Sequence, residues 1–369
     1  MLRSATRLVR LTSPDRPLDR ELLHAAGGFA WWYLDAIDPQ GNGVVVIWSF
    51  GLPFLPGYRA ASRRGEAPSA RERPSLNVAV YREGREAFYL LQEYPTHDAS
   101  WDGEEWRFGD SVLRSEVRGG RRQASLSLDC PLPGTRDRLR GRIALDGVPR
   151  RPTASAQPTL DDHDWSPLTG PATVDASLRV GSRSILDFAG RGYHDRNGSR
   201  TPFDRLGIDH WVWGRVPMPD RELIYYVLWP EGGGAPEALA LEIDDAGQTR
   251  DVPVRARLTG ERRARYGMPY WDRLELLEPD GGAWLDVRHG ALLDDGPFYL
   301  RFGTEATRGG ARAHGTGELV RPGRVDLAPM RPFVKMRVHH TEAPTSRLNP
   351  LFTGPRRGRW RRQLETLLG

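Results

Sequence analysis

The sequence contains a single cysteine, Cys130, so an internal disulfide framework and a cysteine-based zinc site are excluded. It has no apolar run of about 18 residues, the length that a membrane-spanning helix requires. Residues 1–20 carry scattered arginines without an apolar stretch, so we expect no secretory signal. Phosphate-binding loops, nucleophile elbows and His-Glu-x-x-His zinc motifs are missing as well. These common catalytic and membrane-spanning classes therefore do not describe the chain.

Lysine occurs only once, at Lys335, and arginine supplies the remaining basic charge of a chain whose net charge is +5. Outside the C-terminal end, the arginines do not cluster with aromatic residues as they do in proteins that bind single-stranded nucleic acid. We therefore expect no nucleic-acid partner.

Glycine and proline, present 41 and 30 times, divide the 369 residues into short segments in which polar and apolar positions alternate. This pattern is typical of an antiparallel all-β protein. Residues 29–36 and 44–50 are rich in β-formers and are joined by a Gly/Asn turn, which predicts a hairpin. Tyr33 points to one face of the first strand and Trp32 and Leu34 to the other, so both faces are expected to be covered, as in a filled barrel.

Evenly spaced strands continue on both sides of a Pro/Ala/Ser/Asp-rich segment at residues 147–164. This rhythm predicts an all-β fold with two similar antiparallel β-barrels in tandem, residues 28–165 and residues 166–325. Residues 326–369 are predicted to form an extended tail that ends in a short basic amphipathic helix.

The predicted helix places Trp360, Leu364, Leu367 and Leu368 on one face, with arginines around them. Two interpretations stay open: the helix lies on an anionic membrane surface, or it docks on its own domain. We accordingly expect a cytoplasmic protein, with the inner membrane surface as a candidate peripheral partner. The oligomeric state is not predicted.

Residues 51–58 form an apolar segment interrupted by proline and glycine. Such a loop is either a lid over an apolar cavity or ordinary buried packing, and the sequence favours neither.

The segment at residues 190–213 combines an acid with aromatic residues. Tyr193 and Asp195 are two residues apart and share one face of an extended strand, with His194 on the other face. Trp211 and Trp213 likewise share a face. One interpretation is a functional cavity, and the other is an exposed strand end that leads into a polar turn.

The run Asp161-Asp162-His163-Asp164-Trp165 has metal-binding residue types, but neighbouring side chains on a strand point to opposite faces. It offers at most a partial ligand set, so no metal site is predicted. On an extended segment His163 and Trp165 share a face.

Several of these motifs, in matching order, resemble the carotenoid 1,2-hydratase (hydroxyneurosporene synthase) family, which lies within a wider group of tandem lipocalin-like (AttH-like) proteins. The resemblance runs from about residue 28 to residue 319. The motifs are Trp31-Trp32-Tyr33-Leu34-Asp35-Ala36, the apolar segment at residues 50–58, Leu76-Asn77-Val78-Ala79-Val80-Tyr81, Gly192-Tyr193-His194-Asp195-Arg196-Asn197 and His210-Trp211-Val212-Trp213.

The resemblance implies two lipocalin-like barrels and a hydro-lyase that adds water to the terminal C1–C2 double bond of an acyclic carotene, of the lycopene or neurosporene type, without a cofactor. A His-x-Trp pair and a Tyr-x-Asp pair are implicated in that family, and they match His163 with Trp165 and Tyr193 with Asp195.

Acid catalysis of alkene hydration needs a strong proton donor and protection for a tertiary carbocation. A carboxyl group in an apolar pocket stays protonated, which makes Asp195 the candidate acid. Tyr193 and Trp165 are candidates to face the cation, and His163 to hold Asp195 or to direct the attacking water.

Candidate substrate-binding residues are Trp31, Tyr33, Trp211 and Trp213. Two alternatives stay open: a pericyclase or cyclase on the same scaffold, and a non-catalytic lipid- or polyene-binding protein. A rounded pocket favours cyclisation, and a solvent-exposed Asp195 favours a carrier.

Overall fold

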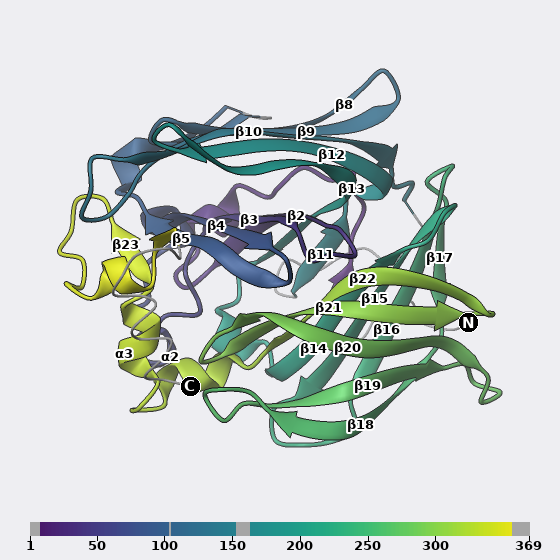
Figure 1. Ribbon diagram of the computed structural model, residues 1–369. Coiled ribbons are helices and arrows are strands. Elements are labelled where there is room, and N and C mark those ends of the chain that lie inside the picture. The colour runs from purple at the N-terminus through teal and green to yellow at the C-terminus, as the bar shows by residue number, and fades with distance from the viewer. Residues whose placement is uncertain (1–7, 103–104, 153–162, 356–369) are drawn as a thin grey trace.

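Two large, mainly antiparallel sheets contain most of residues 8–102, 105–152 and 163–355, which are the residues described by this computed structural model (Figure 1). The 15-stranded first sheet runs in the order β23 (Val338–His340), β5 (Arg85–Glu93), β4 (Pro74–Arg82), β3 (Gly43–Phe50), β2 (Phe29–Ile37), β13 (Arg183–Ser199), β12 (Thr169–Val180), β10 (Arg138–Pro149), β9 (Arg121–Pro131), β8 (Ser111–Arg118), β7 (Glu105–Phe108) and β6 (Ala99–Trp101), with β1 (Arg10–Leu11), β11 (Asp164–Pro167) and β24 (Gly354–Pro355) attached. The 9-stranded second sheet runs β17 (Thr249–Val252), β16 (Glu237–Asp244), β15 (Arg221–Pro230), β14 (Ile208–Pro217), β22 (Ala311–Val320), β21 (Tyr299–Arg308), β20 (Ala283–Asp295), β19 (Pro269–Leu277) and β18 (Arg255–Arg263).

Helices are few and short. They are α1 (Glu21–His24), α2 (Tyr58–Arg63) and α3 (Arg331–Lys335), together with the 3₁₀ turns η1 (Ala70–Glu72), η2 (Thr96–Asp98), η3 (Phe203–Arg205), η4 (Pro322–Asp326) and η5 (Asn349–Leu351). No helix in the described parts of the chain is both long and apolar enough to cross a membrane. The all-β fold class is confirmed, and each sheet curls into a half-barrel.

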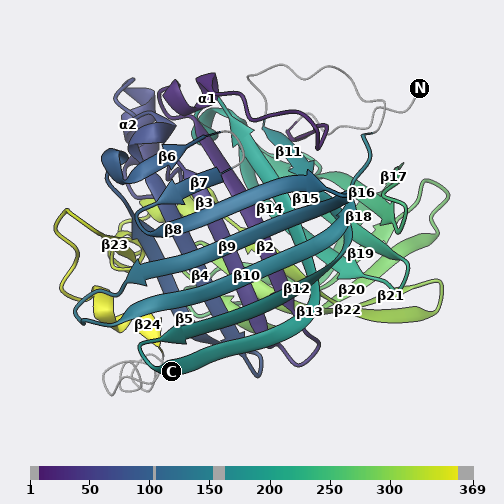
Figure 2. The same ribbon diagram turned by 90° about the horizontal axis from the view of Figure 1, so that it is seen from above.

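The first sheet folds over itself because β13 changes partners along its length. Its first part pairs with β12 as far as Gly192, and its last part, from Tyr193 to Ser199, pairs with β2. A Cβ on Gly192 would lie 2.2 Å from Val174, so only glycine fits at the change of partner. Seen from above, β9, β10 and β12 cross over β2–β5 (Figure 2).

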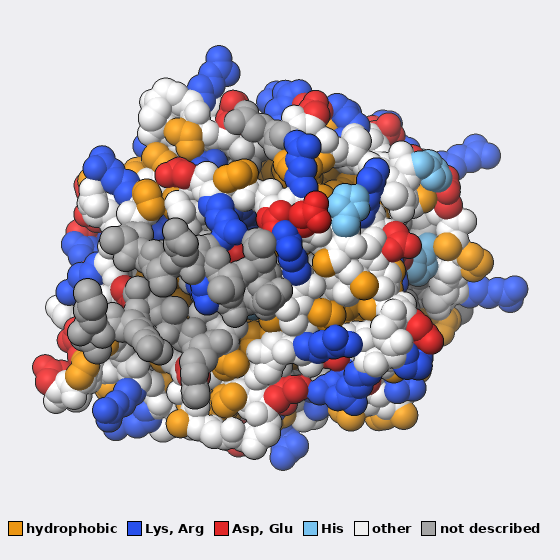
Figure 3. All heavy atoms as spheres, turned by 180° about the vertical axis from the view of Figure 1, so that it is seen from behind, with side chains coloured by type: hydrophobic (Ala, Val, Ile, Leu, Met, Phe, Trp, Pro, Cys, Tyr) orange, Lys and Arg blue, Asp and Glu red, His pale blue; other side chains and the backbone are white. Residues whose placement is uncertain are grey.

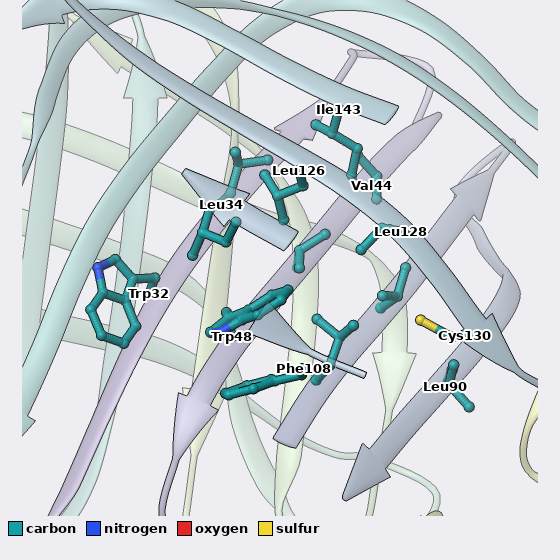
Figure 4. Packing of buried hydrophobic residues seen from close by; sticks show 14 of the residues in the cluster. Trp32, Leu34, Val44, Trp48, Leu90, Phe108, Leu126, Leu128, Cys130 and Ile143 are labelled. Carbon is teal, nitrogen blue, oxygen red and sulfur yellow. The ribbon is translucent and has the colours of Figure 1, made fainter. Parts of the chain in front are cut away.

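The two layers of the first sheet enclose an apolar core of aliphatic and aromatic side chains (Figure 4). At its centre Trp48 of β3 stacks on Phe108 of β7 with ring centroids 4.4 Å apart. The single cysteine, Cys130, is fully buried there, as a small core residue.

A second core lies between the two sheets, and a third lies inside the second sheet. On β2, Trp32 belongs to the first core and Tyr33 to the core between the sheets. On β14, Trp211 and Trp213 face the core between the sheets, whereas Val212 belongs to the third core. The predicted alternation on both strands is confirmed, and each strand is buried on both faces.

The expected boundary between the barrels, after residue 165, does not match the sheets. Both β12 and β13 follow that boundary in the chain, yet both pair within the first sheet. The regular spacing of strands predicts where strands occur, but it carries no information on which strands they pair with. The sequence of residues 190–197 was also compatible with a strand end that leads into a turn. In the structure these residues lie within β13.

Residues 326–355 do not form an extended tail. They contain α3, and β23 and β24 both pair with β5 at the edge of the first sheet. This returns the end of the described chain to its N-terminal half (Figure 1). The predicted basic helix, from residue 356 onward, lies outside the described residues.

The molecular surface carries charges of both signs. On the face drawn in Figure 3, arginines and acidic side chains are interspersed and hydrophobic side chains form small separate groups. This distribution is typical of a protein surface without a large single-sign field.

A buried ion pair joins the two sheets. Arg215 of β14 donates from Nε to Oδ1 of Asp35 on β2 at 2.6 Å and from Nη1 to Glu222 on β15 at 3.0 Å. The exposed fractions of the three side chains do not exceed 1%. A charge removed from such a group leaves its partners uncompensated in a low-dielectric interior.

We predict that Arg215→Met lowers the free energy of unfolding by about 3–5 kcal/mol, because Asp35 and Glu222 stay buried without a cation. Replacing all three residues by neutral ones (Asp35→Asn, Arg215→Met, Glu222→Gln) is expected to recover most of the loss. Urea denaturation followed by tryptophan fluorescence measures both changes. Arg257→Met, which removes a largely exposed partner of Glu275, serves as the control with a midpoint near the wild type. An Arg215→Met protein as stable as the wild type would contradict this interpretation.

Candidate active site

Asp195 lies in the core between the two sheets, with an exposed fraction of 3%. Its strand, β13, holds it opposite Tyr33 of β2 and opposite Pro167 of β11. The alternative of an exposed strand end is therefore wrong, since Asp195 is enclosed among aromatic side chains.

Three neutral donors bind the Asp195 carboxyl group. Oδ2 accepts hydrogen bonds from Trp165 Nε1 at 2.8 Å and from the Tyr193 hydroxyl at 3.0 Å, and Oδ1 accepts one from Asn197 Nδ2 at 3.1 Å. Two bonds occupy both lone pairs of Oδ2, so the position left for a proton is on Oδ1. The arrangement brings together three of the four predicted catalytic residues.

Burial raises the pKa of Asp195 to about 8, and the charges of Glu318 and Asp35 act in the same direction. The hydrogen bonds from Trp165 and Tyr193 oppose the rise. The described part of the chain places no cation in ion-pair contact with Asp195. The carboxyl group is consequently protonated near neutral pH, while its three donors are in place to stabilise the carboxylate once the proton has left.

His163 acts on Asp195 only through Asn197. Its Nε2 lies 3.1 Å from Asn197 Oδ1, an acceptor, so Nε2 carries the proton. Burial lowers the pKa of His163 to about 4, which keeps the ring neutral at pH 7. Of the two roles expected for His163, holding Asp195 would have to act through the amide of Asn197, which lies between them.

A small chamber of about 30 Å³ adjoins Asp195. It is lined by residues from both sheets: Trp31, Tyr33, Trp165, Asp195, Asn197, Trp211, Trp213, Tyr226 and Glu318. All four predicted substrate-binding aromatics are among them. The site is therefore between the half-barrels and not inside either one.

A larger, mainly apolar cavity of about 150 Å³ continues from the chamber and shares Trp31, Tyr33, Trp211 and Glu318 with it. Its far wall includes residues 52–55 and, from the C-terminal segment, Val334 and Arg337. The cavity ends at the apolar loop whose role the sequence left open.

That apolar loop separates the inner cavity from an outer depression of about 530 Å³. Leu52 and Leu55 line both spaces, and Phe54 packs against Phe203 with ring centroids 5.1 Å apart. Both readings of the loop thus apply: it packs on the core between the sheets and it walls the cavity. Lys335 and Val338, from the C-terminal segment, also line the depression.

Sequence reasoning missed Asn197, Tyr226 and Glu318. Asn197 had a usable signal, because it stands two residues after Asp195 and shares its strand face. Glu318 had none: it is an acid in β22, and only the packing of the second sheet on the first brings it to Asp195.

Among the described residues, one group of histidine and acidic side chains is close enough together to hold a metal ion, and it consists of the exposed His97, Asp98 and Glu342. None of the three lines the cavity.

Comparison with known families gives one clear result. The family described as carotenoid hydratase CrtC matches residues 46–345 of this chain. The chain belongs to the carotenoid hydratase CrtC family. The resemblance read from the motifs is confirmed.

Two relatives of this carotenoid hydratase family member match over most of its length. The hydroxyneurosporene dehydrogenase of Chlorobaculum tepidum is 30% identical over 354 residues, which covers 86% of this chain and 88% of that protein. The acyclic carotenoid 1,2-hydratase of Thiocapsa roseopersicina is 29% identical over 325 residues, or 82% of this chain and 70% of that protein.

Solved structures share the fold. A putative AttH from Nitrosomonas europaea superposes with a TM-score of 0.58 at 16% identity, covering 83% of this chain and 98% of that one. CghA in complex with Sch210972 gives 0.55 at 15% identity, covering 86% and 97%. These likenesses support the AttH-like, lipocalin-like architecture.

The raised pKa of Asp195 predicts an unusual dependence of stability on pH. The folded protein holds this proton up to about pH 8, whereas the unfolded chain releases it near pH 4. Between these values the folded state binds more protons, so rising pH destabilises the wild type by up to roughly 1.4 kcal/mol per pH unit through this group. Asp195→Asn is expected to remove that slope and to be the more stable protein at pH 8.

Urea denaturation at intervals between pH 4.5 and 8 measures this difference. Asp286→Asn is the matched control: its pKa is lowered in the folded state by Arg273, so its effect changes only at more acidic pH. Parallel stability curves for wild type and Asp195→Asn would mean that Asp195 ionises normally.

Proposed function

We propose that the protein is an acyclic carotenoid 1,2-hydratase that adds water across a terminal double bond by acid catalysis from Asp195, without a cofactor. Family membership supports the activity. The observation that carries the mechanism is the burial of Asp195 beside an apolar cavity, with no cationic partner among the described residues, which raises its pKa to about 8.

Asp195 supplies the proton in the first step. Its Oδ1 proton passes to C2 of the alkene, and a tertiary cation forms at C1. The donors Trp165, Tyr193 and Asn197 then hold the carboxylate, which makes the proton transfer less costly than burial alone would allow.

Aromatic faces protect the cation. Trp31, Trp211, Trp213 and Tyr226 surround the chamber, and each ring that faces a cation in a dry site contributes roughly 0.5–2 kcal/mol. The same rings exclude bulk water, which limits capture of the cation to water held in the site.

The dimensions of the spaces favour reaction at the end of a polyene. In another protein an apolar cavity of about 150 Å³ holds one benzene molecule, so the inner cavity accommodates roughly one terminal isoprenoid unit. The rest of a long substrate would occupy the outer depression beyond Leu52 and Leu55. The linear sequence of chamber, cavity and depression supports a long substrate over the compact ligand of a cyclase, and the buried Asp195 argues against a simple carrier.

The direct test is to incubate the purified protein with lycopene or neurosporene in D₂O enriched in H₂¹⁸O. We expect a hydroxylated product with one deuterium at C2 and ¹⁸O at C1, and an unchanged rate after dialysis against a chelator. Because kcat/KM reports the free enzyme, it should fall about tenfold per pH unit above pH 8, as Asp195 loses its proton.

Asp195→Asn is predicted to lower turnover by at least about 10²–10⁴-fold, because the amide cannot donate an acidic proton. Asp286→Asn should retain wild-type turnover. Product formation by Asp195→Asn at the wild-type rate would remove Asp195 from the mechanism.

The apolar loop at residues 51–58 gives a separate prediction about how the substrate reaches the inner cavity. Leu55→Trp adds bulk between the depression and the cavity, so kcat/KM for a carotene is expected to fall roughly tenfold or more. A short acyclic terpene with the same end group should be less affected. Leu327→Trp, at an exposed position that lines neither space, is the control. Equal losses for the long and short substrates would exclude this route.

A further inference from the structure

Two carboxyl groups, Asp195 and Glu318, line the innermost chamber, and their partners differ. The donors to Asp195 are neutral. Glu318 Oε2 instead accepts hydrogen bonds from the Tyr299 hydroxyl at 2.5 Å and from the Arg301 guanidinium at 3.0 Å. A guanidinium favours the ionised carboxylate, so the two acids are in unlike environments, one suited to give a proton and one to take it.

The second oxygen of Glu318 is available to the chamber. Both hydrogen bonds end on Oε2, and within the described parts of the chain Oε1 accepts none. The side chain retains an exposed fraction of 14% although it lies between the sheets, as expected for a group on a cavity wall.

The chamber has the size and the polar groups that a water molecule needs. Its volume of about 30 Å³ exceeds the roughly 10–15 Å³ that a cavity needs to hold one water molecule. Trp213 also lines it, and its buried Nε1–H has no hydrogen-bond acceptor among residues 8–102, 105–152 and 163–355. Buried donors in folded proteins usually have an acceptor, so this N–H is a candidate to bind a water oxygen.

We propose that this chamber holds the water that is added to the alkene, with Trp213 Nε1–H binding the water oxygen and Glu318 Oε1 taking the proton that the water loses. The inference rests on the proposed hydratase function and assigns its second half-reaction. It makes Glu318 the general base that complements Asp195.

The proton and electron pairs balance. The π electrons of the alkene form the C2–H bond with the proton of Asp195, and a lone pair of the water oxygen forms the C1–O bond. The water then gives one proton to Glu318, which leaves Asp195 ionised and Glu318 protonated. Transfer of that proton from Glu318 to Asp195 through water in the chamber restores both groups.

The electrostatics are consistent with this role. Burial raises the pKa of Glu318 above its ordinary value, and Arg301 opposes the rise. Glu318 is thus a stronger base than an exposed glutamate, and its guanidinium partner favours the carboxylate form that can take up a proton.

The test separates protonation of the alkene from capture of the cation. Wild-type protein and Glu318→Gln are incubated with lycopene in D₂O, and both the hydroxylated product and the deuterium in recovered alkene are measured by mass spectrometry. We expect Glu318→Gln to lower hydration by about 10²–10⁴-fold. Deuterated or double-bond-shifted alkene should still form, because Asp195 continues to make the cation and the cation then loses a proton instead of gaining water.

Two further variants keep the result interpretable. Trp213→Phe removes the N–H donor while keeping an aromatic ring, and it should also raise the ratio of exchange to hydration. Glu242→Gln neutralises another buried glutamate bound to arginines, but one that lines neither cavity nor chamber, and it should keep the wild-type ratio.

Wild-type hydration by Glu318→Gln, or equal loss of hydration and exchange in a Glu318→Gln protein that melts like the wild type, would overturn the assignment. A wild-type protein that gives neither product nor exchange would instead refute the proposed function, and the inference with it.

Discussion

The site depends on one constraint: a carboxyl group is buried between two sheets, and no cation in the described part of the chain balances it. The neighbouring acids in the same region all have one. Asp35 binds Arg215, Glu318 binds Arg301 and Asp294 lies 3.5 Å from Arg337. A charge is costly to bury without a counter-charge, and burial raises the pKa of Asp195 to about 8. Acidity in this protein is thus a property of the packing between the sheets and not of the residue by itself.

Register on the two central strands fixes which side chains reach that region. Because β2 and β14 are buried on both faces, a slip of one residue would exchange Tyr33 with Trp32, or Trp211 with Val212, and would move the aromatic lining into a different core. Filling both faces with bulky side chains of different shape makes each alternative register unfavourable. The packing that stabilises the fold therefore also determines which aromatic side chains line the cavity.

The sequence predicted what depends on local spacing. The Tyr193-x-Asp195 and His163-x-Trp165 patterns were expected to share strand faces, and the structure places Tyr193, Trp165 and, through Asn197, His163 at Asp195. The sequence did not predict which strands pair, because β13 pairs with β2 across a separation of some 160 residues in the chain. For the same reason Glu318 could not be found, since only the docking of the second sheet brings it near Asp195. The C-terminal segment was missed because its pairing with β5 depends on an edge that no local pattern reveals.

A continuous hydrogen-bonded network connects the structural ion pair to the proposed base. Arg215 holds Asp35, Asp35 accepts from the Tyr33 hydroxyl at 2.8 Å, and Tyr33 accepts from Arg301 at 2.6 Å, which in turn holds Glu318. The network draws members from both sheets, so it forms only when they are packed together. Asp195 lies close to this network but is not a member of it, because the donors bonded to it are neutral. The fold thereby separates a half of the site that contains ion pairs from a half with neutral donors, and the proposed reaction, which begins with proton donation and ends with proton uptake, requires both.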